Sequence, residues 1–340
     1  MELINFAIDF GNGYVKAKSG KKMFIYPSKL GHASDLGTSS LKELDSKDDV
    51  SIFQRKDEGK YVMGSDIEDV IEPAELLSTS ELNNRYENIL FKRLIDFVLV
   101  DLASFEDQES IDVRLVTGMP SHENAMARKK KAFHDYLLGR HIATKDGKEY
   151  VINIKELKII EQPLGTLLNE FMNDEYKVHK AFKRGNIVVI DLGSGTTIID
   201  HYKNMKRING EVMNDGMNHF LSNIAKKLTQ QIETSVDAAH INEGIRNKTF
   251  KADLAEMGYP FKELLEKQAE KKIQNIISKY TSVVDQESLI NRFILTGGGA
   301  NVIGVTFAKV KDNFYRVENP QIATVNGYFK LANSLEQYSK

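Results

Sequence analysis

Two segments far apart in the chain share one pattern, and this repeat constrains the fold more than any other feature. The first runs from Ile8 to Lys16 as IDFGNGYVK, and the second runs from Ile190 to Asp200 as IDLGSGTTIID. Each is an apolar strand ending in an aspartate, followed by a turn with two glycines and a second β-prone run. This order predicts a hairpin whose tip offers a carboxylate and backbone N–H groups. Two such hairpins facing each other would grip a polyphosphate and its metal ion, so the repeat predicts a duplicated fold with a nucleotide in its cleft.

The bulk composition narrows the class of protein. A length of 340 residues predicts about two domains, and 41% hydrophobic with 28% charged residues suits a sizeable core. The net charge of −2 argues against direct nucleic-acid binding as the main function. The absence of cysteine excludes disulfides, thiolate metal ligands and a cysteine nucleophile. No apolar run approaches the ~18 residues of a membrane span, and residues 1–6 lack a basic leader, so we expect a cytoplasmic protein without membrane contact.

The first half is predicted to open with a strand meander and to continue through a small polar insertion at about 28–76. Ser78 to Glu81 offer helix N-caps, and an apolar stripe at helical spacing follows to about residue 104. The other predicted elements are strands at 3–9, 12–18, 22–26, Val50–Gln54, Lys60–Gly64 and Asp112–Val116, a helix at about 123–138 and a hairpin at about 141–161.

The second half is predicted to repeat this plan after a helix that opens around Glu161 to Gly165, with Pro163 near its first turn. The predicted elements are strands at 186–191 and 197–203, a helix at about 216–232, a helical insert to about 280, a last strand at Phe293–Leu295 and a tail helix from Ala323.

The first hairpin carries residue types suited to a metal-bound phosphate. Asp9 is expected at the end of a central strand, where α/β sheets present ligands, and Mg²⁺ takes one or two carboxylates while keeping several waters. Gly11 and Gly13 let the backbone approach phosphate oxygens without a Cβ in the way, and Lys16 offers a point charge. On its own this segment is better explained as a plain hairpin with an Asn-Gly turn. The matched second copy is what favours the phosphate interpretation.

The second hairpin repeats this chemistry. Asp191 supplies the carboxylate, the Gly193-Ser194-Gly195 turn supplies backbone amides, and Thr196 and Thr197 offer hydroxyls to phosphate or to a metal-bound water. Later, Thr296-Gly297-Gly298-Gly299 follows a buried strand and precedes a helix-like stretch. Three glycines let a flat nucleoside lie against backbone, with a helix N-terminus behind them. A lone triple glycine is usually a flexible loop, and its place after the two hairpins gives it weight.

Glu161 and Gln162 stand before Pro163, at the start of the helix expected to join the two halves. A side chain here could orient the water that attacks a γ-phosphate. Phosphoryl transfer depends on positioning and charge neutralisation more than on a strong base, so an amide or a carboxylate could serve. The alternative is that these residues only cap the helix.

These four segments, in this order and across essentially the whole chain, resemble the ATPase superfamily that includes actin and the sugar kinases. The resemblance implies an α/β, actin-like ATPase fold in which two RNase-H-like domains flank a nucleotide cleft. Asp9, Gly11, Gly13 and Lys16 match the first loop of actin at identical spacing. The implied domains are 1–163 together with the C-terminal helix at about 324–340, and 164–323 with a helical insert at about 215–290.

The resemblance also implies the site. Asp9 and Asp191 would hold Mg²⁺, and these two residues with Gln162 or Glu161 would form the catalytic set. Actin has a glutamine at the position that Gln162 matches, whereas glutamate is common in bacterial relatives. The implied contacts to ATP or ADP, with GTP open as an alternative, are Gly11, Asn12, Gly13, Tyr14, Lys16, Gly193, Ser194, Gly195, Thr196, Gly216, Gly297, Gly298, Gly299 and Asn301. The charged helix at 262–272, with Lys262 and Lys267, lies in the region from which relatives contact the ribose, and a solvated helix face explains it equally.

Within the superfamily, Val116-Thr117-Gly118-Met119-Pro120 resembles a strand of the prokaryotic plasmid-segregation actins, the ParM and StbA group, with Met119 in place of the usual leucine. That branch implies a filament-forming ATPase that associates with itself head to tail and reaches plasmid DNA through a small DNA-binding adaptor. Two alternatives stay open: a non-polymerising small-molecule kinase of the same superfamily, and a scaffold that binds nucleotide without turnover.

Overall fold

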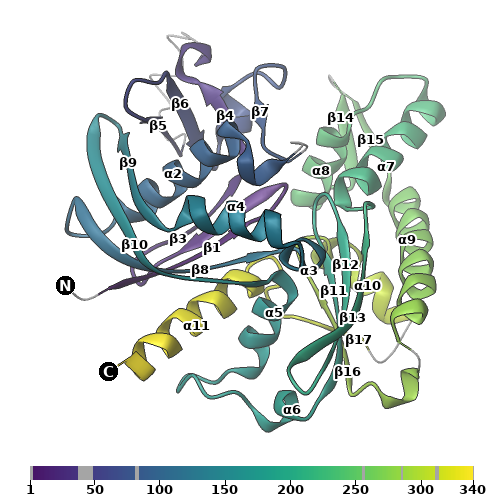
Figure 1. The fold of residues 1–340 in the computed structure, drawn as a ribbon. Coiled ribbons are helices and arrows are strands. Elements are labelled where there is room, and N and C mark those ends of the chain that lie inside the picture. Colours follow the sequence, from purple (N-terminus) through teal and green to yellow (C-terminus); the bar gives the residue numbers. More distant parts are fainter. Residues whose placement is uncertain are drawn as a thin grey trace. The chain divides into compact units, whose positions relative to one another are not determined.

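The computed structural model describes residues 3–36, 49–80, 84–254, 257–284, 286–310 and 314–339. The chain divides into two compact units (Figure 1). Unit 1 contains residues 1–177 and 324–340, and unit 2 contains residues 178–323. No helix among the described residues is long and apolar enough to cross a membrane.

Unit 1 is built on a mixed sheet centred on β1 (Ile4–Phe10), which is buried along almost its whole length. β1 pairs antiparallel with β2 (Tyr14–Lys18) and parallel with β8 (Ser110–Met119). The strand order in the described chain is β3-β2-β1-β8-β10-β9-β5-β6-β4-β7. The remaining strands are β3 (Met23–Pro27), β4 (Lys29–His32), β5 (Val50–Gln54), β6 (Lys60–Gly64), β7 (Leu77–Ser78), β9 (Gly139–Lys145) and β10 (Lys148–Glu161).

The helices of unit 1 close its core. α2 (Ile89–Ala103) packs against β9 and β10, as Figure 1 shows, and it supplies eleven buried residues from Phe91 to Ala103. The apolar core joins this helix to one face of β1, through Phe6, Ile8 and Phe10, and to Phe133 of α4 (Ala127–Leu137). The shorter helices are α1 (Ile67–Val70), η1 (Ala33–Asp35), η3 (Arg85–Glu87) and α3 (Ser121–Asn124).

Two further helices complete unit 1. α5 (Gln162–Phe171) follows β10, and α11 (Ala323–Ser339) begins at the end of unit 2 and belongs to unit 1 almost entirely. The Thr166 and Thr324 hydroxyls lie 3.1 Å apart, and a Cβ on Gly327 would lie 1.8 Å from the carbonyl oxygen of Gly165. This close packing explains why unit 1 extends to Lys177 and takes in α5, whereas the predicted boundary was residue 163.

Unit 2 repeats the strand plan with a smaller sheet. Its order is β13-β12-β11-β16-β17, an antiparallel meander joined to parallel strands, as in the β3-β2-β1-β8-β10 part of unit 1. The strands are β11 (Asn186–Leu192), β12 (Thr197–Lys203), β13 (Lys206–Met213), β16 (Arg292–Thr296) and β17 (Phe314–Arg316). The duplicated fold predicted from the two hairpins is therefore confirmed.

The longer helices of unit 2 share one apolar core with its sheet. A separate hairpin, β14 (Lys251–Leu254) and β15 (Met257–Pro260), lies within the stretch predicted to be helical. The helices are α6 (Lys180–Lys183), α7 (Met217–Ile232), α8 (Ala238–Arg246), α9 (Lys262–Val283), η4 (Glu287–Leu289) and α10 (Ala300–Val310).

Candidate functional site

The first hairpin of unit 1 places a carboxylate, an ammonium and an amide in contact. Asp9 and Lys16 are register partners on β1 and β2, and the Lys16 Nζ lies 2.9 Å from Asp9 Oδ2. Gln162 Nε2 donates to the other carboxylate oxygen, Asp9 Oδ1, at 2.8 Å. Asp9 itself is 4% exposed. Three residues singled out from the sequence, 153 positions apart at the extremes, therefore form one cluster.

The side chains of Glu161 and Gln162 contact different partners. The structure therefore distinguishes two residues that the sequence offered as alternatives for the same role. Gln162 is the first residue of α5, and its side chain reaches Asp9. Glu161 precedes the helix without capping it, and Glu161 Oε1 accepts a hydrogen bond from Asn124 Nδ2 at 3.1 Å. The predicted alternative of plain N-capping therefore explains neither side chain.

The carbonyl oxygens of the first hairpin are bound from behind. Ser28 Oγ donates to Gly11 O at 2.7 Å, and the Ser28 amide donates to Gly13 O at 2.9 Å. Arg85 donates to the carbonyls of both Phe10 and Gly11 at 3.0 Å. Sequence reasoning missed Ser28 and Arg85, because neither lies in the hairpin. A Cβ on Gly11 would lie 2.5 Å from Tyr14 O, so the turn requires a glycine there.

The second hairpin, in unit 2, begins with Asp191 near the end of β11. The amide of Gly193 donates to Thr196 O at 2.9 Å and closes the turn. The start of α7 then binds the turn through three consecutive amides. These are Gly216 N to Gly195 O at 3.2 Å, Met217 N to Gly193 O at 2.9 Å and Asn218 N to Ser194 O at 2.9 Å.

The triple glycine lies beside this second hairpin. Thr296 is the register partner of Asp191, so Gly297 follows directly beside the carboxylate. Gly297 has a φ of +83°, and a Cβ there would lie 2.3 Å from Asp191 Oδ1. A Cβ on Gly299 would lie 2.6 Å from the sulfur of Met217, whereas one on Gly298 would meet nothing closer than 4.0 Å. Unit 2 therefore gathers the predicted residues of the turn, the triple glycine and Gly216.

Asn301 follows the triple glycine on α10 and makes a contact of its own. Its side-chain oxygen accepts a hydrogen bond from Arg316 at 3.0 Å, and the residue is exposed. A nucleotide that binds the Asn301 side-chain oxygen would therefore compete with Arg316 of β17 for it.

A buried lysine ties α9 to the start of α7. Lys272 is 5% exposed, its ammonium donates to the carbonyl oxygen of Asp215, and its Nζ lies 3.3 Å from Asp215 Oδ1. Burial lowers the pKa of Lys272, partly offset by the Asp215 carboxylate. Burial acts to raise the pKa of Asp215, but His219 and Lys272 outweigh it, so the pKa of Asp215 falls below its usual value. The Lys272 ammonium thus holds Asp215, the residue just before Gly216. No sequence motif predicts this role for Lys272.

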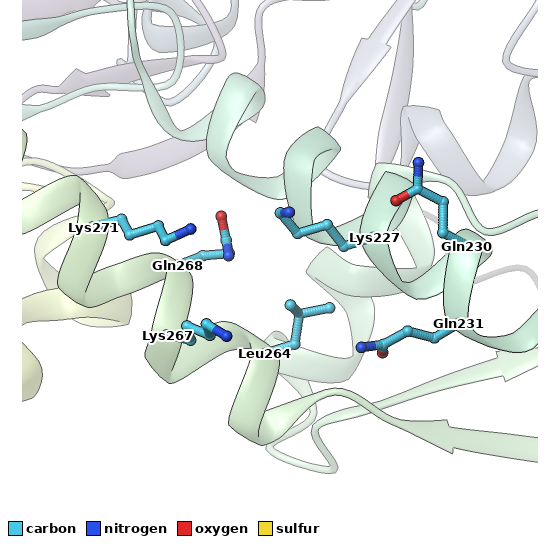
Figure 2. A pocket seen from close by; sticks show the side chains of 7 residues that line it. All are labelled: Lys227, Gln230, Gln231, Leu264, Lys267, Gln268 and Lys271. Atoms are coloured by element: carbon cyan, nitrogen blue, oxygen red, sulfur yellow. The ribbon is translucent and has the colours of Figure 1, made fainter.

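A groove lined by lysine and glutamine lies elsewhere in unit 2 (Figure 2). It has a volume of about 240 Å³ and is lined by Lys227, Gln230 and Gln231 of α7 and by Leu264, Lys267, Gln268 and Lys271 of α9. Lys227 lies eleven positions after Gly216, which is ~16 Å along the axis of α7. Lys271, at the other side of the groove, is next to Lys272, which contacts Asp215. Of the predicted helix face, Lys267 lines it, whereas Lys262 is exposed to solvent.

The residues present fit a metal-bound polyphosphate in their chemistry. Each hairpin ends a central strand with a carboxylate, and each turn has its carbonyls bound by the protein. Glycines stand where a Cβ would intrude, at Gly11, Gly216 and Gly297. Within the described chain, three or more His, Asp or Glu side chains nowhere gather as a metal cluster. A carboxylate at the end of each central strand suits Mg²⁺, which takes one or two carboxylates and keeps several waters.

A duplicated α/β fold with a carboxylate and a glycine turn at matching strand ends defines a class of two-domain nucleotide-binding folds. Comparisons with known proteins agree. A model of the N-terminal domain of actin-like proteins matches residues 7–165, and one of the C-terminal domain of archaeal MreB-like actin homologues matches residues 189–309. No curated protein sequence matches the chain.

Solved structures extend the match to the whole chain. The apo ParM protein of pSK41 is 31% identical, with 99% of each chain covered and a TM-score of 0.79. A ParM from a 15-stranded filament of Clostridium botulinum is 19% identical, covering 98% of this chain and 100% of the other, with a TM-score of 0.79. An archaeal actin homologue solved with ADP is 17% identical, with the same coverage and a TM-score of 0.76. The chain belongs to the actin-like protein superfamily, as its motifs predicted.

Proposed function

We propose that this protein is a Mg²⁺-dependent, actin-like ATPase whose filaments move plasmid DNA, with GTP as an alternative nucleotide. The observation that carries the proposal is the contact of Gln162 with Asp9, beside Lys16, at the end of β1. The similarity to the pSK41 ParM protein over the full length of both chains supports it. The Clostridium botulinum ParM, solved as a filament, shares the fold and supports self-association.

In this proposal the two hairpins divide the work of binding. Asp9 and Asp191 would hold Mg²⁺, which would supply charge neutralisation when bound. Lys16 adds a positive charge, and the Gly11–Tyr14 and Gly193–Thr196 turns bind phosphate oxygens through backbone amides. Gly216, the 297–299 glycines and Asn301 would contact the nucleoside.

Gln162 is the residue that we propose orients the attacking water. Its Nε2 is engaged by Asp9 Oδ1, and this contact fixes the side chain so that its carbonyl oxygen serves as the acceptor for a proton of the water. Positioning of this kind is what phosphoryl transfer requires from the protein. Glu161, whose carboxylate accepts from Asn124, acts on the rate only indirectly.

Polymerisation would couple turnover to movement. Head-to-tail contacts that do not close into a ring give an open filament. The triphosphate would favour the filament and hydrolysis would loosen it, by hinge-like closure of the units. With a net charge of −2, the chain has little electrostatic attraction for DNA, so a small DNA-binding adaptor would make the link. We propose a cytoplasmic location for this activity.

Phosphate release as a function of protein concentration tests the proposal against its alternatives. A filament-coupled ATPase releases phosphate from nucleotide alone, and its rate per molecule rises steeply above a threshold concentration. Activity linear in protein and dependent on an added acceptor would overturn the filament and identify a small-molecule kinase. Nucleotide binding without phosphate release at any concentration would identify a scaffold.

A further inference from the structure

Arg85 binds the first hairpin at three points at once. Its Nη1 donates to Phe10 O at 3.0 Å and to Asn12 Oδ1 at 2.9 Å, and its Nη2 donates to Gly11 O at 3.0 Å. The residue stands at the start of η3, just after Asn84, whose φ of +51° turns the chain there. One planar guanidinium thus holds consecutive residues of the turn, a geometry that a flexible point charge does not reproduce.

The Arg85 side chain is half-buried, and its Nε is buried. No carboxylate in the described chain lies within ion-pairing distance of it, and its Nε has no hydrogen-bond partner there. The charge rests on the Phe91 ring, 4.1 Å away. Burial lowers the pKa of Arg85, with Tyr86, Glu123 and Asp9 opposing the effect. Within the described chain, the hydrogen bonds of this cation therefore all go to the hairpin, which points to a role in the turn itself.

The second hairpin shows what that role is. There, three amides at the start of α7 bind the carbonyls of the turn from behind. In the described part of unit 1, no run of amides from a helix start binds the first hairpin, and Arg85 with Ser28 binds its carbonyls instead. A peptide group whose C=O is fixed toward the protein has its N–H on the opposite side, because the group is planar. The peptide groups of both turns are therefore held by hydrogen bonds to their carbonyls, but the donors differ between the two turns.

We propose that Arg85 is a positioning residue that locks the carbonyls of the first hairpin inward, so that its amides face the phosphates of the nucleotide. The inference rests on the proposed function, since it assigns a residue to that nucleotide site. If this is right, replacing Arg85 should weaken the binding of a ligand in proportion to the number of phosphates that the ligand carries. The base and the ribose should contribute nothing to this loss of affinity.

The test compares Arg85→Met, Arg85→Lys and a matched control, Arg93→Met. Arg93 also stacks on an aromatic ring, that of Tyr61 at 5.0 Å, and pairs with Glu58, but it does not contact the hairpin. We expect Arg85→Met to weaken ATP and ADP binding at least 10-fold by calorimetry and to leave adenosine binding, followed by NMR, within 2-fold. Arg85→Lys should lose affinity for ATP 3-fold or more, and Arg93→Met should bind like the wild type.

A second readout is independent of nucleotide. Arg85 binds the carbonyls of Phe10 and Gly11, whose peptide groups carry the amides of Gly11 and Asn12. The NMR order parameters of these two amides should fall from about 0.85 in the wild type to below about 0.6 in Arg85→Lys, with the rest of β1 unchanged. If Arg85→Met does not fold, Arg85→Lys carries both measurements. Wild-type ATP affinity together with wild-type order parameters in Arg85→Lys would overturn the inference, and so would an equal loss for adenosine and ATP. Failure of the wild type to bind any nucleotide would instead overturn the proposed function, and the order parameters would still judge Arg85.

Discussion

At the scale of single residues, the candidate site depends on a few side chains that β1 and α5 bring together. Asp9, Lys16 and Gln162 were all predicted from motifs, and the structure joins them. Arg85 and Lys272 were not predicted, because each reaches its partners across more than fifty positions of sequence. A hairpin motif records its own glycines, whereas the donors that bind its carbonyls lie elsewhere in the chain and leave no local pattern.

Replacement of Gln162 by alanine should slow phosphate release about 100-fold or more, because the attacking water loses the acceptor that orients it. Nucleotide affinity should change little, since Asp9 and Lys16 remain. Glu161→Ala, which frees Asn124 instead, should have a smaller effect. Gln54→Ala, which removes a glutamine bonded to Glu58 O at 2.8 Å, serves as the control. A larger loss in Glu161→Ala than in Gln162→Ala would contradict the assignment.

The triple glycine offers a matched pair for stability. Gly297→Ala forces a Cβ into positive φ and to 2.3 Å from Asp191 Oδ1, so we expect a loss of at least about 2 kcal/mol in the free energy of unfolding. Gly298→Ala meets nothing closer than 4.0 Å and should cost less than about 1 kcal/mol. Urea titrations of the two variants measure the free energies of unfolding. Equal losses in the two variants would contradict the expected clash between a Cβ at position 297 and Asp191.

At the scale of elements, regular strands were the most predictable part. Val50–Gln54, Lys60–Gly64 and the strand at 197–203 occur with the predicted bounds. The predicted helix after Ser78 instead begins at Ile89, because the Asn88 side chain accepts from Leu90 N at 2.8 Å and caps it there. The proposed cap at Glu81 lies outside the described residues.

Other elements escaped prediction for a different reason. β17 is three residues long and pairs only with β16, so its sequence carries no alternation to detect. β14 and β15 are four residues each and stand among helical stretches. Strands this short are specified by the partner that they pair with, and not by a pattern of their own.

The junction of α3, η3 and α4 should respond to acid. Tyr86 and Lys129 contact the two oxygens of Glu123 at 2.6 and 2.5 Å. Burial would raise the pKa of Glu123, but these hydrogen bonds outweigh it and hold the pKa below its usual 4.5. Because the folded pKa is depressed, the carboxylate stabilises the fold above pH 4.5, and that contribution is lost as the pH falls through the folded pKa.

Glu123→Gln should therefore be less stable than the wild type by roughly 1–2 kcal/mol at pH 7. The difference should shrink as the pH falls below about 4.5, because the wild type then loses the same charge. Denaturant titrations from pH 7 to pH 3 measure it. Glu87→Gln, which breaks an exposed pair with Arg128, should change stability by less than about 0.5 kcal/mol. A difference for Glu123→Gln that stays constant down to pH 3 would refute the linkage.

At the scale of the whole molecule, the duplicated strand order was predictable because both copies of the hairpin head the same meander. The contacts that would build a filament could not be predicted from the sequence. They depend on surface side chains of two neighbouring copies, and no motif encodes strand number or handedness. Whether nucleotide drives this chain into a polymer is therefore decided by assembly and not by any single residue.

Right-angle light scattering of the purified protein measures this assembly. The protein is mixed in turn with Mg-ATP, Mg-GTP, Mg-ADP and a non-hydrolysable ATP analogue, over a series of protein concentrations. We predict a rapid rise with a triphosphate above a threshold concentration, persistence of the signal with the analogue, and little signal with ADP. A flat trace at every concentration, with nucleotide shown to be bound, would contradict nucleotide-driven assembly.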